Sequence, residues 1–220
     1  MLIAFPVFGK EDIPSCKIEN NKVISQNICH GFIIISEEFT YEGDFYNGRI
    51  NGKGIFIWLN KNLFNDYVGD FKNDRLHGKG KLTWVNGDMY IGNFVLGKIE
   101  GHGKKIFNNG NIYEGLFEDG VFNGIGKYID INNNIYEGNF KNGSFEGNGS
   151  IIYENGDKYN GHWYEGKRSG KGIWQSSNDG SSYQGDWKEG LPDGIGIITY
   201  KDGTKQKGKF LEGDLIELLN

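Results

Sequence analysis

The sequence predicts an all-β fold: an elongated, single-layer antiparallel β-meander built from tandem 23-residue hairpin repeats. Three observations support this prediction. Tyrosine-led segments recur at a nearly constant spacing, glycines occupy fixed places within them, and apolar and polar residues alternate with the period of a strand. Of the 36 glycines, all but Gly9 and Gly31 fall at repeat positions. Positions within a repeat are counted below from its tyrosine, which is position 0.

The repeat is clearest between Tyr90 and Tyr113, where Phe94 holds position 4 and glycines hold positions 2, 7, 11 and 13. Because each repeat contacts only its neighbours, no central core is needed. We expect a degenerate N-terminal repeat or cap over residues 1–40 and seven repeats over residues 41–205. A partial eighth repeat and a C-terminal cap follow over residues 206–220. The seven repeats begin at Tyr41, Tyr67, Tyr90, Tyr113, Tyr136, Tyr159 and Tyr183.

The N-terminal segment departs most from the repeat. Short β-prone runs at 23–28 and 32–35 predict atypical strands, as is usual at the end of a solenoid. Cys16 and Cys29 match no zinc spacing, and a lone pair gives weak support for a disulfide, so we expect reduced, intracellular thiols. Neither a signal peptide nor a membrane-spanning run is recognisable, which predicts a cytoplasmic protein, cytoskeleton-associated or peripheral to a membrane.

Each repeat reads as a hairpin, and Asn-Gly pairs such as Asn86-Gly87 mark the turns between repeats. A two-residue turn there would place Thr83 opposite Tyr90. A three-residue turn with a glycine bulge would instead place Leu82 opposite Tyr90, so that aromatic residues and glycines share one face and polar residues the other. Binary patterning favours this bulged register.

The C-terminal segment carries leucines with a helical spacing, which predicts a short helix that caps the final hairpin. The alternative is a self-association patch at an open sheet edge, through which a homodimer would form. The residues concerned are Leu211, Leu215, Leu218 and Leu219.

The pattern Tyr-x-Gly-x-Phe/Trp, followed by glycines at positions 7, 11 and 13, resembles the MORN (membrane occupation and recognition nexus) repeat family. The resemblance covers residues 41–213 and departs locally at Asp74, Asn133 and Gln206. It implies a non-catalytic scaffold or adaptor that binds another protein, with cytoskeletal, cortical or motor-protein partners. The family name suggests an alternative, a peripheral membrane module that recognises anionic phospholipids.

Composition and motifs exclude several function classes. The net charge of −5 and a pI of about 5.4 oppose nucleic-acid binding and strong adhesion to an acidic bilayer, both of which normally need a basic face. The sequence contains no phosphate-binding loop or dinucleotide fingerprint, and its four histidines are not spaced as metal ligands. We therefore expect no enzyme, no cofactor and no metal.

Aromatic residues at positions 0 and 17 form ladders that either hold the sheet together or receive a partner. Apolar residues at position 9 form another ladder, which either staples loops to their neighbours or makes a second surface. The predicted partner-binding residues are Trp84, Tyr90, Phe107, Tyr113, Tyr136 and Tyr153. The candidate second surface consists of Ile99, Phe122 and Phe145.

Overall fold

The computed structural model describes residues 13–60 and 62–219. The chain divides into two compact units. The first consists of residues 13–87 together with Asn93–Lys98, and the second of Asp88–Gly92 together with residues 99–219. Both units are made of strands and turns, and the described residues contain no helix.

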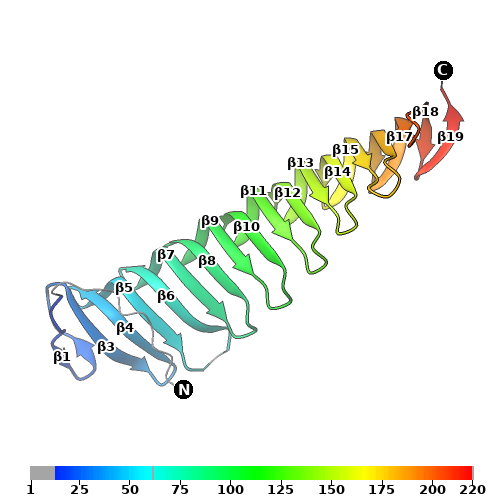
Figure 1. Ribbon diagram of the computed structural model, residues 1–220. Coiled ribbons are helices and arrows are strands. Elements are labelled where there is room, and N and C mark those ends of the chain that lie inside the picture. The colour runs from blue at the N-terminus through cyan, green and yellow to red at the C-terminus, as the bar shows by residue number, and fades with distance from the viewer. Residues whose placement is uncertain (1–12, 61, 220) are drawn as a thin grey trace. The chain divides into compact units, whose positions relative to one another are not determined.

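The first unit holds a small hairpin and the first strands of the meander (Figure 1). These are β1 (Ile18–Glu19), β2 (Lys22–Val23), β3 (Cys29–Ser36), β4 (Phe39–Tyr46), β5 (Arg49–Trp58), β6 (Phe64–Lys72) and β7 (Arg75–Trp84). The residues of β8 (Met89–Val95) are divided between the two units.

The second unit continues the pattern with strands that Figure 1 shows as successive hairpins. They are β9 (Lys98–Ile106), β10 (Ile112–Glu118), β11 (Val121–Ile129), β12 (Ile135–Lys141), β13 (Ser144–Ile152), β14 (Lys158–Tyr164), β15 (Lys167–Gln175), β16 (Ser182–Lys188), β17 (Leu191–Thr199), β18 (Lys205–Leu211) and β19 (Asp214–Leu218).

The predicted fold class is confirmed. The 17 strands from β3 to β19 follow chain order as an antiparallel meander that is not closed into a barrel. Among the described residues, β3 pairs with β4 alone in this sheet and β19 pairs with β18 alone. Pairing between consecutive strands is expected where a short turn joins each strand to the next.

The bulged register is also confirmed at the repeats whose pairings are described. Between β11 and β12, Tyr128 lies opposite Tyr136 and Gly126 opposite Gly138. The turn between repeats has three residues, as at Asn109-Gly110, where Gly110 adopts φ 96° and its N–H donates to the carbonyl of Phe107. Glycine tolerates this left-handed conformation at no steric cost.

The turn within each repeat is tighter. Positions 6 and 7 both have positive φ, as in the two-residue turns that match the twist of paired strands. Position 6 holds asparagine or aspartate in the first, second, fourth and fifth repeats and glutamate in the sixth and seventh, whereas the third repeat has Leu96 at φ 51°. The left-handed conformation brings the Cβ of Leu96 close to the following carbonyl oxygen. A leucine side chain forms no local hydrogen bond that would offset this cost. The turn therefore contains a strained residue.

We expect Leu96→Asn to stabilise the protein by about 0.5–1 kcal/mol, because asparagine tolerates the left-handed region. The measurement is the urea midpoint followed by tryptophan fluorescence. Val95→Asn is the matched control, since Val95 is exposed on the adjacent strand and loses strand propensity when replaced. Stabilisation by both substitutions, or by neither, would contradict the assignment of strain to Leu96.

The outer edge of β3 is covered by the N-terminal segment. The N–H of Cys16 donates to the carbonyl of His30, and the N–H of His30 donates to the carbonyl of Pro14, so that Ser15 forms a parallel bridge with His30. Further along the edge, the side-chain amide of Asn21 bonds both the N–H and the carbonyl of Ile34. Covering an edge strand in this way prevents unwanted strand pairing.

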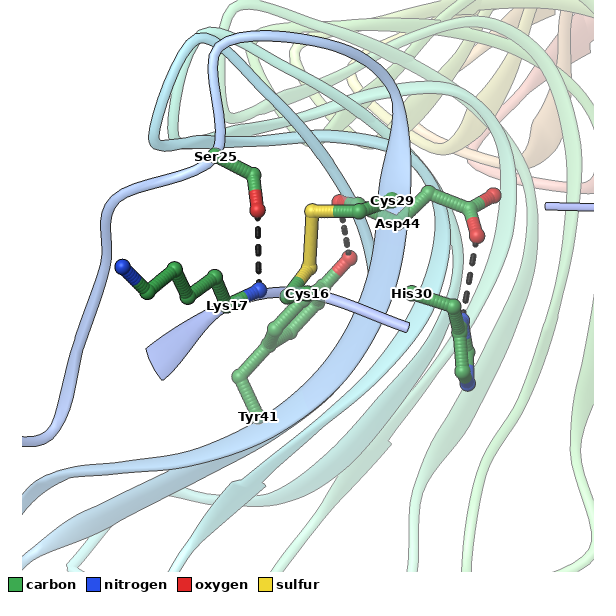
Figure 2. The surroundings of a disulfide bond; sticks show 7 residues. All are labelled: Cys16, Lys17, Ser25, Cys29, His30, Tyr41 and Asp44. Carbon is green, nitrogen blue, oxygen red and sulfur yellow. Dashed lines mark hydrogen bonds and ion pairs between the residues drawn. A yellow bond between two sulfur atoms is a disulfide. The ribbon is translucent and has the colours of Figure 1, made fainter. Parts of the chain in front are cut away.

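A disulfide between Cys16 and Cys29 ties this covering segment to β3 (Figure 2). The expectation of reduced thiols is therefore wrong for this structure. The two cysteines are 13 positions apart in the sequence, and their Cα atoms lie 4.9 Å apart. Sequence spacing could not show this approach, because it results from the segment turning back onto β3 through the β1–β2 hairpin.

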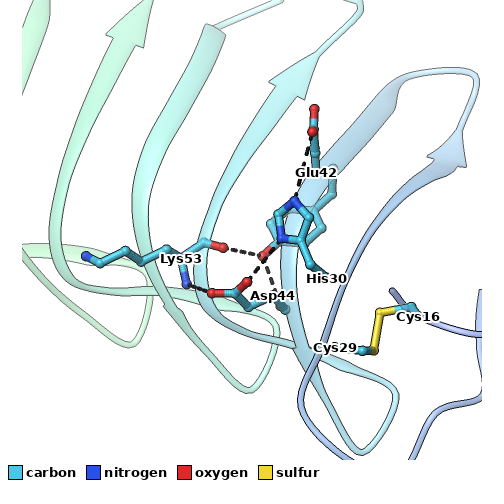
Figure 3. Close-up of polar contacts among 7 residues, drawn as sticks. Cys16, Cys29, His30, Glu42, Asp44 and Lys53 are labelled. Carbon is cyan, nitrogen blue, oxygen red and sulfur yellow. Dashed lines mark hydrogen bonds and ion pairs between the residues drawn. A yellow bond between two sulfur atoms is a disulfide. The ribbon is translucent and has the colours of Figure 1, made fainter. Parts of the chain in front are cut away.

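Asp44 on β4 links the first three strands of the meander (Figure 3). Its carboxylate lies 3.1 Å from Nδ1 of His30 on β3 and accepts a 3.0 Å hydrogen bond from the N–H of Lys53 on β5. Asp70 and Asp186 hold the same position 3 in their repeats and bond the equivalent backbone N–H groups of Lys79 and Ile195. These carboxylates satisfy backbone donors at the bulge, which is a structural role.

The predicted C-terminal helix is wrong, because residues 214–218 form strand β19. Leu215 lies opposite Phe210 and covers Gly208, as the aromatic residues of other repeats cover their own glycines. Glu212 and Gly213 make the preceding turn with positive φ. Pairing with β18 overrides the helical spacing of the leucines, as tertiary context commonly does in short segments.

Candidate protein-binding surface

Alternation along the strands gives each repeat two different faces. In β10, Tyr113 and Phe117 point to the same side as Gly115 between them, whereas Glu114 and Glu118 are exposed on the other side. We call the first side the aromatic face and the second the opposite face.

The tyrosines at position 0 are buried on the aromatic face. Tyr113 is 0% exposed, and its ring stacks on Phe122 at 3.8 Å between centroids and meets Phe117 and Phe140 edge-on. Its hydroxyl donates a 2.8 Å hydrogen bond to the carbonyl of Leu116. Burial raises the pKa of Tyr113 to about 12, so the neutral form is strongly favoured.

Glycines make room for these rings. Gly115 and Gly126 face each other across β10 and β11, and a Cβ added at Gly126 would lie 2.6 Å from the Tyr113 hydroxyl oxygen. The tyrosine ring therefore lies flat on the backbone. A single layer of sheet obtains an aromatic core in this way, without a second layer of secondary structure.

This packing divides the predicted partner-binding residues into buried and accessible ones. Tyr90, Tyr113 and Tyr136 are at most 1% exposed, so their side chains are not available to a partner. The sequence pattern contained the relevant signal, namely the glycines at positions 2 and 13 on which each ring lies. The other predicted residues are half-buried and retain accessible ring surface; they are Trp84, Phe107 and Tyr153.

The position-9 ladder belongs to the same face. Phe122 stacks on Tyr113, and Phe145 stacks on Tyr136 with 3.7 Å between ring centroids. Ile99 holds the equivalent position and is half-buried as well. These residues therefore cover the tyrosines on the aromatic face, and Phe122 and Phe145 do not form a separate second surface.

A groove lies on the aromatic face of the second unit. Its volume is about 310 Å³, and Gly143 and Ser144 contribute to its wall. We call it the aromatic groove. Three of the residues predicted from the sequence line this groove, namely Phe107, Phe122 and Phe145. Trp84 and Tyr153 do not line it. Tyr128 lines it but was not among the predicted residues. The aromatic lining consists of Phe107, Phe122, Tyr128, Phe140 and Phe145.

Polar groups border this groove. The Nζ of Lys105 lies 4.7 Å from the centroid of the Phe107 ring and 3.7 Å from a carboxylate oxygen of Asp88. The Tyr128 hydroxyl accepts a 2.7 Å hydrogen bond from the side-chain amide of Asn111, and burial raises its pKa. The groove thus combines apolar ring surface with a cation and a hydroxyl at its margin.

A second aromatic cluster was also missed by the sequence prediction. The guanidinium of Arg168 lies 5.2 Å from the Trp174 ring and 4.5 Å from the Trp187 ring, at cation–π distances. Tyr153, which was predicted, contacts Trp174 with 5.5 Å between centroids. Arg168 occupies position 9, where other repeats have apolar residues, and this departure could have drawn attention to it.

The described residues hold neither a metal-binding cluster nor a membrane-spanning helix. Within residues 13–60 and 62–219, no cluster of three or more His, Cys, Asp or Glu side chains is arranged to hold a metal ion. Those residues also include no helix long and apolar enough to cross a bilayer.

The open meander and its glycine-seated aromatic rings define a tandem-repeat β protein. The model of the MORN repeat matches residues 41–62, 67–89, 90–112, 113–135, 136–158, 159–181 and 183–205. The chain belongs to the MORN repeat family. No curated protein sequence matches it.

Among solved structures, the chain is similar to domains of two centriolar proteins. The CPAP G-box domain shares 12% identity with a TM-score of 0.47, and the match covers 83% of this chain and 99% of that domain. The SAS-4 TCP domain of Drosophila melanogaster, in complex with a proline-rich motif of Ana2, also shares 12% identity, with a TM-score of 0.41 and coverage of 94% and 99%. At these values the likeness supports no inference about function.

Proposed function

We propose that this chain is a non-catalytic scaffold that binds a protein partner on its aromatic face, with the aromatic groove as the main contact. The observation that carries the proposal is the groove itself, in which five aromatic rings surround a hollow of about 310 Å³. Aromatic side chains in a partly desolvated hollow are where interface energy usually concentrates. A cytoplasmic location and a cytoskeletal, cortical or motor-associated partner belong to the same proposal.

The choice of contact residues follows from burial. A tyrosine at position 0 cannot reach a partner, so the contact falls to half-buried rings such as Phe107 and Tyr128, and outside the groove to Trp84 and Tyr153. These rings keep accessible surface and can bury further area without any change in the sheet. Rigid aromatic groups of this kind lose little conformational entropy on binding.

The test variant combines Phe107→Ser with Tyr128→Ser, which removes two half-buried rings from the groove. The matched control is Ile125→Ser with Ile152→Ser, which removes exposed apolar side chains from the opposite face of the fourth and fifth repeats. Immobilised wild-type protein should capture a specific partner that the control retains, and the groove variant should lose it at least about 10-fold. Circular dichroism and urea denaturation establish that both variants fold.

Equal capture by both variants would show that the aromatic groove is structural. Salt-sensitive sedimentation of wild-type protein with phosphatidylserine vesicles, without a protein partner, would favour phospholipid recognition instead. Sedimentation velocity of the purified proteins tests a second copy as partner through β19, where Ile216 and Leu218 are exposed. A monomer at all concentrations would exclude that homodimer.

A further inference from the structure

We propose that the opposite face of β14 to β18 is a second docking surface, which takes an extended, acidic segment of a partner protein. It is separate from the aromatic groove because it lies on the other side of the sheet. Its components are a row of glycines, exposed isoleucines beside that row, and lysines concentrated on β18.

The glycine row makes a channel across the strands. Gly161 pairs with Gly172, Gly172 with Gly185, Gly185 with Gly196, and Gly196 with Gly208. On the aromatic face, tyrosine rings fill the space above such glycines. On the opposite face the row forms the floor of a hollow of about 520 Å³. Side chains flank this floor on both sides. A single extended chain therefore fits the hollow better than a flat partner surface does.

The walls of this hollow are partly apolar. Ile195 and Ile197 are 51% and 37% exposed on β17, and Ile173 is 39% exposed on β15. All three line the hollow. In the repeats that begin at Tyr90 and Tyr113, by contrast, this face has ion pairs between strands, such as Lys104 with Glu114 and Lys127 with Glu137. Exposed isoleucines also occur on this face in earlier repeats, as at Ile125, so the last repeats are distinguished by the lysines of β18 beside the isoleucines.

The charge of this face is reversed on β18. Lys205, Lys207 and Lys209 occupy positions −1, 1 and 3, and all three are exposed. In the seven preceding repeats these positions hold one lysine, Lys158, and seven carboxylates. The carboxylates are Glu42, Asp44, Asp66, Asp70, Glu114, Glu137 and Asp186.

Nearby carboxylates offset only part of this charge. Asp186 already accepts a 2.6 Å contact from Nζ of Lys171 and a hydrogen bond from the N–H of Ile195. Glu217 on β19 lies opposite Lys209. Lys207 lies opposite Ile197 and Lys209 opposite Ile195, so each of these lysines has an apolar neighbour across the strand pair.

This arrangement suits an extended acidic chain. Lys207 and Lys209 flank Gly208, where the glycine row ends on β18, and lie about 7 Å apart along the strand, so a chain that follows the glycine row passes between them. Carboxylates of the peptide would pair with the lysines while its apolar side chains cover the isoleucines. Charge complementarity of this kind determines the choice of partner and its orientation. An anionic bilayer fits less well, since the chain has a net charge of −5.

The probe is a fluorescein-labelled ten-residue peptide of alternating glutamate and valine, with a lysine–valine peptide as the reversed partner. Fluorescence anisotropy should show saturable binding of the acidic peptide to wild-type protein. Lys207→Glu combined with Lys209→Glu should weaken that binding at least about 10-fold and create binding of the lysine–valine peptide. The control, Lys72→Glu with Lys141→Glu, makes the same charge change at exposed positions outside the hollow.

Several results would overturn the proposal. These are no saturable binding of the acidic peptide, an equal loss in the control variant, or lysine-dependent capture of phosphatidylserine vesicles without peptide binding. The protein with Phe107→Ser and Tyr128→Ser must still bind the acidic peptide. Failure of the aromatic groove and failure of this surface are thereby distinguished. Circular dichroism verifies that each variant is folded.

Discussion

Replacing Tyr113 with serine is expected to lower the free energy of unfolding by about 3–5 kcal/mol, the usual loss when a buried aromatic side chain is truncated. The ring is completely buried, and it contacts Phe117, Phe122 and Phe140. Its removal leaves a cavity lined by rings from two repeats. The measurement is urea denaturation followed by circular dichroism, with a fall in the midpoint and little change in its slope.

Tyr113→Phe is the matched control. It removes only the hydroxyl that donates to the carbonyl of Leu116, and we expect a loss of about 1 kcal/mol. If Tyr113→Ser were no more destabilising than Tyr113→Phe, the tyrosine layer would not be the core of the sheet. The result also bears on function, because a loss of partner binding after this substitution would follow from unfolding rather than from a lost contact.

The second large effect is expected for Gly103→Val, with a loss of about 3 kcal/mol or more from overpacking and backbone displacement. A Cβ at Gly103 would lie 2.3 Å from Cε2 of Tyr90 and 2.5 Å from its Cζ. The ring of Tyr90, the tyrosine of the same repeat, therefore occupies the space that the valine side chain would need. Neither the ring nor the backbone can move without breaking the packing of the repeat.

Gly110→Asn is the control, because its φ of 96° favours glycine or asparagine and an added Cβ would have no neighbour within 4 Å. We expect a loss below about 1 kcal/mol. A double-mutant cycle with Tyr90→Ala sharpens the test: Tyr90→Ala should be less destabilising in the Gly103→Val protein than in the wild type. Additive losses would disprove the predicted contact.

The two faces of the sheet provide different chemistry for binding. The aromatic face offers rings with few charges, whereas the opposite face of the second unit offers lysines beside isoleucines. A scaffold with two such surfaces, one centred on β11 to β13 and the other on β14 to β18, would hold two unlike partners. The tests above separate them, because each variant pair changes side chains on one face and leaves the other face intact.

Most of the fold was predictable from the sequence. The spacing of tyrosines, the glycines at fixed positions and the Asn-Gly turns are local features, and each restricts the backbone directly. Gly110 illustrates this, since only a residue that tolerates positive φ can end that three-residue turn. Together with binary patterning, these local restrictions determined the hairpins and their register without information about distant contacts.

The tertiary structure decided which aromatic residues are accessible. A sequence shows that Tyr113 and Phe107 share a face, but not that the first ring lies on Gly115 and Gly126 beneath Phe122 while the second remains half-exposed. The cysteine pairing and the strand at residues 214–218 depended likewise on segments folding back on neighbours. Burial results from the packing of several repeats at once, so it cannot be read from the spacing of residues within one repeat.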